Sequence, residues 1–292
     1  MSYFFQLTMS GLSIGLIYAL IGMSLMLMLR AAHVMNFAQG SFVVLGAYTS
    51  YVLLKKLEIP YAPLRILIGI VFFALVAAVF YFTCIRPFDK PGRQMSGMVA
   101  TMGASTVIVE LCLIFGTAQT QSMAPIMKGT FKIGTFFLQY QYIFIFIISL
   151  IMMGLVYVFY DKLYCGRIMT AASQDDYAAT LLGIPTTLTT LITMIICVVM
   201  TAVTGWLTAP IYLVTTAISN FQTRAFAGII IGGFGTLGGA ILGGILVGLI
   251  ESYSTYLSST YKDVIVYGVL LLMLLIRPSG ILKNKTGSSI RA

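Results

Sequence analysis

The sequence predicts an all-α polytopic membrane protein with about eight or nine transmembrane helices, some of them short or broken. Of its 292 residues, 59% are hydrophobic and only 9% are charged. A soluble domain carries roughly 25% charged residues, so this composition excludes soluble enzymes and disordered proteins. Since a helix needs roughly 20 apolar residues to span a bilayer, the chain has enough for that many spans with short connections. We therefore expect 1–292 to form a single transmembrane domain.

About nine apolar runs are candidate spans. They lie at residues 8–29, 40–54, 64–85, 96–116, 139–160, 186–208, 222–235, 238–253 and 263–277. Runs 40–54 and 222–235 are shorter than a full crossing. Membranes tolerate broken or re-entrant helices only where the loosened backbone is buried in protein or lines a cavity. These two short runs therefore indicate a transport path.

The distribution of charge predicts the orientation in the membrane. If the loops 86–93 and 161–185 and the basic tail 278–292 are cytoplasmic, about ten Lys and Arg residues face the cytoplasm and about seven face outward. Because Lys and Arg are in excess in cytoplasmic loops, we expect the N-terminus outside and the C-terminus in the cytoplasm, in a bacterial inner membrane. The net charge of +9 is spread over short loops, which indicates contact with the lipid bilayer and no nucleic-acid partner.

No pattern in the sequence predicts a catalytic site, a metal site or a bound cofactor. His33 is the only histidine, which favours an interfacial or capping role, and the four cysteines form no CxxC pair. Gly233, Gly235 and Gly238 match GxGxxG, but the strand and soluble βαβ unit that a dinucleotide site needs are missing. The sequence has no GxxxxGK(S/T) motif. We therefore expect neither an enzyme nor ATP binding in this chain.

The glycine-rich run 227–251 is predicted to pack closely against other helices. GxxxG spacing lets helix backbones approach one another. It occurs at Gly228/Gly232, Gly239/Gly243 and Gly244/Gly248. The sequence GGFGT, 232–236, is expected to break the run into two short helices near the transport path, and packing alone is the alternative. The candidate residues at this break are Gly233, Gly235, Gly238 and Gly239.

Four polar residues in or beside apolar runs are further candidates. Asn36 and Gln39 precede the short run that begins at Gly40, where side-chain amides serve as gates or as caps of a broken helix. Glu110 and Glu251 lie within apolar runs, and an ionisable residue at membrane depth is a functional candidate. The alternative is that both lie close enough to the outer interface to hydrate. If both carboxylates lie deep in the membrane, their position favours proton coupling.

The longest polar loop on the predicted cytoplasmic side is 161–185. Good helix formers occupy 167–182, Gly183 supplies a stop signal and Pro185 prevents continuation. A short helix in this loop either docks into a groove on a soluble partner or lies on the membrane surface without one. The pattern leaves both interpretations open.

Three segments together resemble the membrane subunit of branched-chain amino acid ABC importers, the LivH type. Segment 15–48 is similar to that family's opening helix and its Asn-Phe-Ala-x-Gly turn. Segment 166–185 is similar to its cytoplasmic coupling segment. Segment 225–251, with the later LLIRPSGI of 274–281, is similar to its glycine-rich block and terminal Arg-Pro-x-Gly.

The resemblance implies an ABC importer permease fold and a set of partners. These are a second homologous permease, two cytoplasmic ATPase subunits that carry ATP and Mg²⁺, and an extracytoplasmic substrate-binding protein. On this resemblance, ATP binding and hydrolysis on the partners are expected to drive alternating access, and this chain is expected to translocate branched-chain amino acids. Coupling to the ATPases is assigned to Arg167, Ala171, Asp175, Asp176, Leu182 and Gly183.

Two residues depart from the family pattern. Gln39 stands where the family usually has His, which weakens the case for a titrating role at that turn. Thr170 stands where a second basic residue is common, so the contact with the ATPase is weaker or differently arranged. Three alternatives stay open: a related permease for urea or amides, a secondary transporter coupled to ions through Glu110 or Glu251, and a scaffold that only anchors partners.

Overall fold

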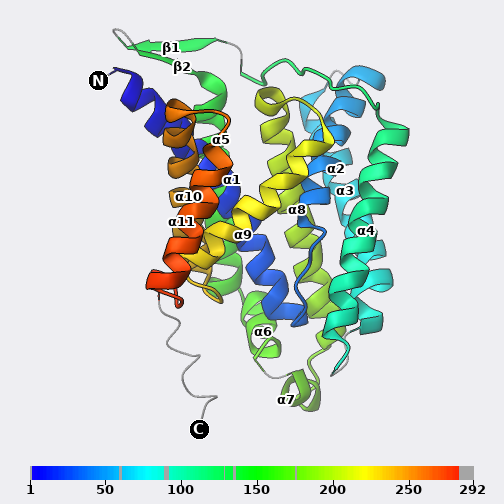
Figure 1. The fold of residues 1–292 in the computed structure, drawn as a ribbon. Helices are drawn as coiled ribbons and strands as arrows, with labels where there is room; N and C mark the ends of the chain where they lie inside the picture. Colours follow the sequence, from blue (N-terminus) through cyan, green and yellow to red (C-terminus); the bar gives the residue numbers. More distant parts are fainter. Residues whose placement is uncertain are drawn as a thin grey trace. The chain divides into compact units, whose positions relative to one another are not determined.

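The structure is a computed structural model that describes residues 2–58, 61–88, 92–127, 129–133, 136–174 and 176–282. Its elements, which Figure 1 colours along the chain, are helices and one short hairpin. The α-helices are α1 (Ser2–Ala32), α2 (Gln39–Tyr51), α3 (Ala62–Phe80), α4 (Gln94–Phe115), α5 (Tyr140–Lys162), α6 (Tyr164–Ala172), α7 (Asp176–Leu181), α8 (Thr186–Tyr212), α9 (Phe221–Gly232), α10 (Leu237–Leu257) and α11 (Lys262–Ile276).

Short helical turns and the hairpin complete the described chain. The turn η1 (Val52–Lys56) extends α2, η2 (Tyr81–Ile85) and η3 (Arg86–Phe88) extend α3, and η4 (Thr216–Asn220) precedes α9. Strands β1 (Thr130–Ile133) and β2 (Phe136–Gln139) pair antiparallel between α4 and α5, with Thr130 opposite Gln139.

The predicted all-α polytopic fold is confirmed, and every predicted apolar run coincides with a helix. Among the described residues, six helices are long and apolar enough to cross a membrane, namely α1, α3, α4, α5, α8 and α10. The two runs predicted to be short are α2, with 13 residues, and α9, with 12. The run 263–277, a candidate span, corresponds to α11, whose 15 residues are fewer than the roughly 20 that a full crossing needs.

The chain divides into two compact units. The first unit consists of Met1–Met26, Ile126–Ile151 and Phe221–Ala292, and the second consists of Leu27–Pro125 and Met152–Asn220. Each unit is therefore assembled from segments that are distant in the sequence.

Glycines allow the helices of the first unit to touch at their backbones. A Cβ added at Gly232 of α9 would overlap the carbonyl oxygen of Gly239 in α10, and one added at Gly243 would overlap that of Gly228. A Cβ at Gly248 of α10 would overlap the backbone of Gly15 in α1. The predicted GxxxG approach is confirmed, with α9 on one side of α10 and α1 on another.

The second unit is organised around α2 and α8. A Cβ at Gly46 of α2 would overlap the carbonyl oxygen of Ala202 in α8, and a Cβ at Gly205 of α8 would overlap that of Val43. Edge-to-face aromatic contacts attach α3 to the same core, with ring centroids 5.6 Å apart for Phe73 and Trp206. Nine of the 13 residues of α2 are buried because the helix packs between its neighbours.

Candidate functional site

The loop predicted to couple to an ATPase folds into two short helices rather than one. α6 ends at Ala172 and α7 begins at Asp176, so the prediction of one helix over 167–182 is wrong. The Ser173 hydroxyl donates a 2.8 Å hydrogen bond to the Thr170 carbonyl, and such a local bond competes with continued helix. Figure 1 shows α6 and α7 at the N-terminal end of α8.

α6 is fixed against α5 by a glycine. A Cβ at Gly166 would overlap the carbonyl oxygen of Phe159, so only glycine allows this approach. Arg167 is exposed, and its Nε donates to the Asp161 carbonyl at 3.1 Å. Ala171 is exposed as well. The first turn of the loop is thus anchored to the end of a long helix, with Arg167 and Ala171 at the surface.

α7 and the residue that follows it expose apolar side chains. Tyr177, Leu181 and Leu182 are 76%, 71% and 81% exposed, and we call these three residues the α7 patch. Gly183 has a φ of +78° and ends the helix, as predicted, and Ile184 N–H donates back to the Ala179 carbonyl at 3.0 Å. Asp175 lies outside the described residues.

The turn between α1 and α2 is held by polar side chains from several helices. His33, which is exposed, follows α1 with a φ of +53°, the left-handed conformation typical of a residue just after a helix. Asn36 Oδ1 accepts a 2.9 Å bond from Ala38 N–H. Gln39 begins α2, and its Oε1 accepts a 2.9 Å bond from the Thr201 hydroxyl of α8. The predicted capping of α2 by a side-chain amide is not found, because Ala38 occupies the N-cap position.

Both amide side chains at this turn are buried. Asn36 is 1% exposed and Gln39 is not exposed. Among the described residues, neither the Asn36 Nδ2 nor the Gln39 Nε2 has a hydrogen-bond acceptor. Gly40, the next residue in the first turn of α2, is buried as well. The structure thus places the three predicted residues together in the interior of the second unit.

The predicted break in the glycine-rich run is confirmed at residues 233–236. Gly233 and Gly235 have φ values of +121° and +88°, which L-residues with a side chain rarely adopt. Thr236 then caps α10, because its Oγ1 accepts a 3.1 Å bond from Gly239 N–H. The chain after α11 closes over the break, where Leu282 N–H donates to the Gly232 carbonyl at 2.9 Å.

The two predicted acidic candidates lie in different environments. Glu110 is exposed on α4, a helix whose apolar side chains are mostly exposed. Glu251 of α10 is only 3% exposed. Its carboxylate is 2.6 Å from Arg224 Nη1 of α9 and 3.6 Å from Lys262 Nζ of α11. Glu251 is therefore buried, whereas Glu110 is at the surface of the second unit.

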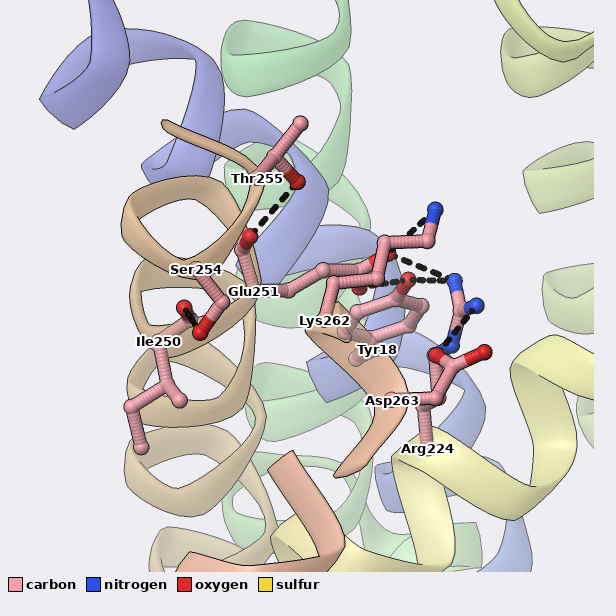
Figure 2. Close-up of polar contacts among 8 residues, drawn as sticks. All are labelled: Tyr18, Arg224, Ile250, Glu251, Ser254, Thr255, Lys262 and Asp263. Atoms are coloured by element: carbon pink, nitrogen blue, oxygen red, sulfur yellow. Dashed lines mark hydrogen bonds and ion pairs between the residues drawn. The ribbon is translucent and has the colours of Figure 1, made fainter. Parts of the chain in front are cut away.

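Glu251 belongs to a buried network that joins four helices of the first unit, shown in Figure 2. Arg224 Nη1 also donates to the Tyr18 hydroxyl of α1 at 3.1 Å, and its Nη2 donates to Asp263 Oδ1 of α11 at 2.8 Å. The Tyr18 hydroxyl donates to Glu251 Oε2 at 2.5 Å. Two cations face two carboxylates, so the network balances its own charge. Arg224 and Glu251 are buried, whereas the Asp263 side chain is 51% exposed and lies at the edge of the network.

The sequence analysis identified Glu251 but missed its partners. Arg224 and Lys262 were counted only among the seven outward-facing basic residues, and Tyr18 and Asp263 were not candidates. A signal was available, because a buried acidic residue in a membrane requires a cation nearby and Arg224 lies in the adjacent apolar run.

Comparison with known proteins places these features in a family. The chain matches the family of branched-chain amino acid transport system permease components over residues 7–274. It belongs to this family. The permease is 26% identical over 294 residues to BraD of Pseudomonas aeruginosa, a high-affinity branched-chain amino acid transport system permease protein, with 96% of each chain covered. It is 27% identical to the corresponding LivH of Escherichia coli K12, also with 96% of each chain covered.

A further relative has a similar description. Probable LivH of Methanocaldococcus jannaschii is 27% identical over 278 residues, which cover 90% of this permease and 87% of that protein. No solved structure matches the permease. The family is one of transport proteins rather than enzymes, and its apolar helices make this permease a multi-pass membrane protein.

Proposed function

We propose that this permease is the membrane subunit of an ATP-driven importer of branched-chain amino acids in the bacterial inner membrane. The observation that carries the proposal is the family match over 7–274, together with relatives that are named as high-affinity branched-chain amino acid permeases. A second homologous permease, two ATPases that bind ATP and Mg²⁺ and an extracytoplasmic substrate-binding protein complete the importer. An apolar amino acid suits passage between helices lined by Gly, Ala, Phe and Met, because weak contacts do not retain it.

The α7 patch supports a contact with the ATPases. α6 and α7 have 9 and 6 residues, too few to span a membrane, and yet Tyr177, Leu181 and Leu182 expose most of their apolar surface. Exposed apolar clusters of this kind mark protein interfaces. With the N-terminus outside and the C-terminus in the cytoplasm, 161–185 lies on the ATPase side, and Arg167, Ala171 and Gly183 complete the coupling surface.

Replacing Leu182 with aspartate is expected to reduce recovery of the ATPases at least tenfold when the tagged permease is purified from gently solubilised membranes. Loss of a central apolar anchor costs about 2 kcal/mol or more, and a charge placed in the interface adds a desolvation penalty. Mass spectrometry of the purified material measures the ratio of ATPase to permease.

The matched control is Thr187→Asp, which places the same charge at an exposed position of α8 outside the α7 patch. It is expected to retain the ATPases at the level of the unmodified permease. Equal retention by Leu182→Asp would show that the α7 patch does not hold the ATPase. Recovery of the unmodified permease without any ATPase would contradict the importer proposal itself.

An ion-coupled transporter is the second candidate, because Glu110 lies in a membrane-spanning helix. Its exposed position on α4 argues against ion coupling, since a coupling residue lies in a bundle interior or a water-filled cavity. We expect Glu110→Gln to change the rate of leucine uptake less than twofold. Uptake of labelled leucine and urea, with and without a protonophore, checks this. A large loss of uptake in Glu110→Gln would favour ion coupling. So would a loss of uptake when the protonophore dissipates the proton gradient while ATP is maintained.

A further inference from the structure

An apolar groove opens on the second unit between α3 and α4, and we call it the α3/α4 groove. Its volume is about 570 Å³, within the roughly 300–1,000 Å³ of ligand pockets. The buried helix α2 contributes the floor through Leu45 and Tyr48, and Phe72 of α3 and Leu111 of α4 line the two sides.

The groove has the length and chemistry of a site for a hydrocarbon chain. Its lining on α3 runs from Ile68 to Val76, which corresponds to about 12 Å at the rise of an α-helix, and on α4 it runs from Ile108 to Phe115. The lining side chains are aliphatic or aromatic, apart from Thr49 and Cys112. The Tyr48 hydroxyl donates to the Thr117 carbonyl at 3.2 Å, so only its ring is left for a ligand.

Two lysines stand at one end of the groove, two and three residues after the lining residue Leu53. Lys56 Nζ donates to the carbonyl of Phe115, which itself lines the groove, at 3.0 Å, and Lys55 Nζ donates to the Ser122 carbonyl at 2.8 Å. These bonds hold the ammonium groups in place, and each ammonium has three donors. Among the described residues, no carboxylate lies within 4.0 Å of either Nζ.

A third cation lies at the same end. Arg65 precedes the lining residue Ile68 by three positions in α3, and residues three or four apart share one face of a helix. Glu110 does not offset these charges, because its position between Ile108 and Leu111 places it on the opposite face of α4 from the lining residues Ile108 and Cys112. Glu58, two positions after Lys56, is exposed and is the one carboxylate of the described chain next to these lysines in the sequence. Three cations against one carboxylate leave this end positive, so it is complementary to an anion.

We propose that the α3/α4 groove binds an anionic phospholipid, with an acyl chain in the groove and the phosphate group at Lys55, Lys56 and Arg65. Any lipid tail fills an apolar groove in a bilayer, and the three cations provide the preference for a negative headgroup. The exposed apolar side chains of α3 and α4 outside the groove, such as Leu75 and Ile114, fit a surface surrounded by lipid.

Native mass spectrometry of the purified full-length permease tests the headgroup preference. Phosphatidylglycerol and phosphatidylcholine with identical acyl chains are titrated separately. We expect phosphatidylglycerol to bind more tightly and Lys55→Gln with Lys56→Gln to lower its affinity about fivefold per lysine, equivalent to roughly 1 kcal/mol each. The control Arg93→Gln with Lys162→Gln removes two exposed cations elsewhere in the same unit and should have no effect. Equal binding of the two lipids would overturn the proposal.

A second pair of variants tests the groove itself. Leu111 lines the groove and is 44% exposed, so Leu111→Trp fills the cavity without disturbing a core position. It should lower the affinity for both lipids at least fivefold. Ile114→Trp, on the same helix but outside the lining, should leave both affinities unchanged. If Leu111→Trp binds phosphatidylglycerol as well as the unmodified permease does, the acyl chain does not occupy this groove.

Photocrosslinking in native membranes identifies the occupant. Benzoylphenylalanine at position 111 is expected to yield a phospholipid adduct of the permease on irradiation. A crosslink to another protein, or to a second copy of the permease, would mean that a helix fills the groove and would overturn the lipid proposal. None of these readouts depends on transport, so their outcome is independent of the proposed function.

Discussion

Arg224→Met is expected to destabilise the permease by about 3–5 kcal/mol, the usual range for removing one partner of a buried ion pair. The change leaves Glu251, which is 3% exposed, with only the Tyr18 hydroxyl and the more distant Lys262 Nζ at 3.6 Å. It also removes the 2.8 Å contact with Asp263 at the start of α11. The side-chain links that Arg224 makes from α9 to α10 and α11 are lost together, so unfolding should begin in the first unit.

The matched measurement is a double-mutant cycle in detergent micelles, followed by denaturant or thermal unfolding. Glu251→Met removes the buried carboxylate, so Arg224→Met with Glu251→Met should recover most of the stability lost in Arg224→Met alone. Arg277→Met, an exposed cation after α11, should change stability by less than about 0.5 kcal/mol. The network does not stabilise the unit if Arg224→Met is as stable as Arg277→Met. The same conclusion follows if the stability losses of Arg224→Met and Glu251→Met simply add in the double variant.

The partners of Glu251 show where prediction from the sequence ends. Apolar runs predict helices because the length of a run is a local property, and the positions of all nine were correct. The Tyr18 hydroxyl, however, comes from 233 residues away in the chain. Only the packing of α1 against α10 brings the two together, and that packing is a tertiary property. The sequence therefore indicates that Glu251 needs a partner but does not identify it.

The distinction between local properties and tertiary packing also holds for the turns and the glycines. The Gly233 break was predictable because φ above zero is a local preference for glycine. The GxxxG spacing predicted close approach but not which helix approaches, and Gly248 packs on α1 rather than on α9. Gln39 was recognised as a buried amide at a turn, but its bond to Thr201 requires the placement of α8.

Gly239→Ala is expected to destabilise the permease by roughly 1–3 kcal/mol, the range for adding a carbon to a tightly packed site. The new Cβ would overlap Thr236 Oγ1, which caps α10, and would lie 2.5 Å from the Gly233 carbonyl oxygen and 3.0 Å from that of Gly232. Since backbone atoms cannot rotate away as side chains do, α9 and α10 must separate or the cap must break. Gly239→Leu adds three further carbons and should abolish uptake.

The adjacent Gly238 is the matched control. A Cβ there meets only the end of the Leu282 side chain, at an ordinary 3.5 Å. Replacing glycine by alanine in a helix is favourable by roughly 0.5–1 kcal/mol when space allows, so Gly238→Ala should be neutral or slightly stabilising. Unfolding in micelles and leucine uptake are measured for both variants. A scaffold without a transport path or close packing would tolerate both changes equally, whereas opposite responses at two neighbouring glycines arise only from the backbone contact at the break.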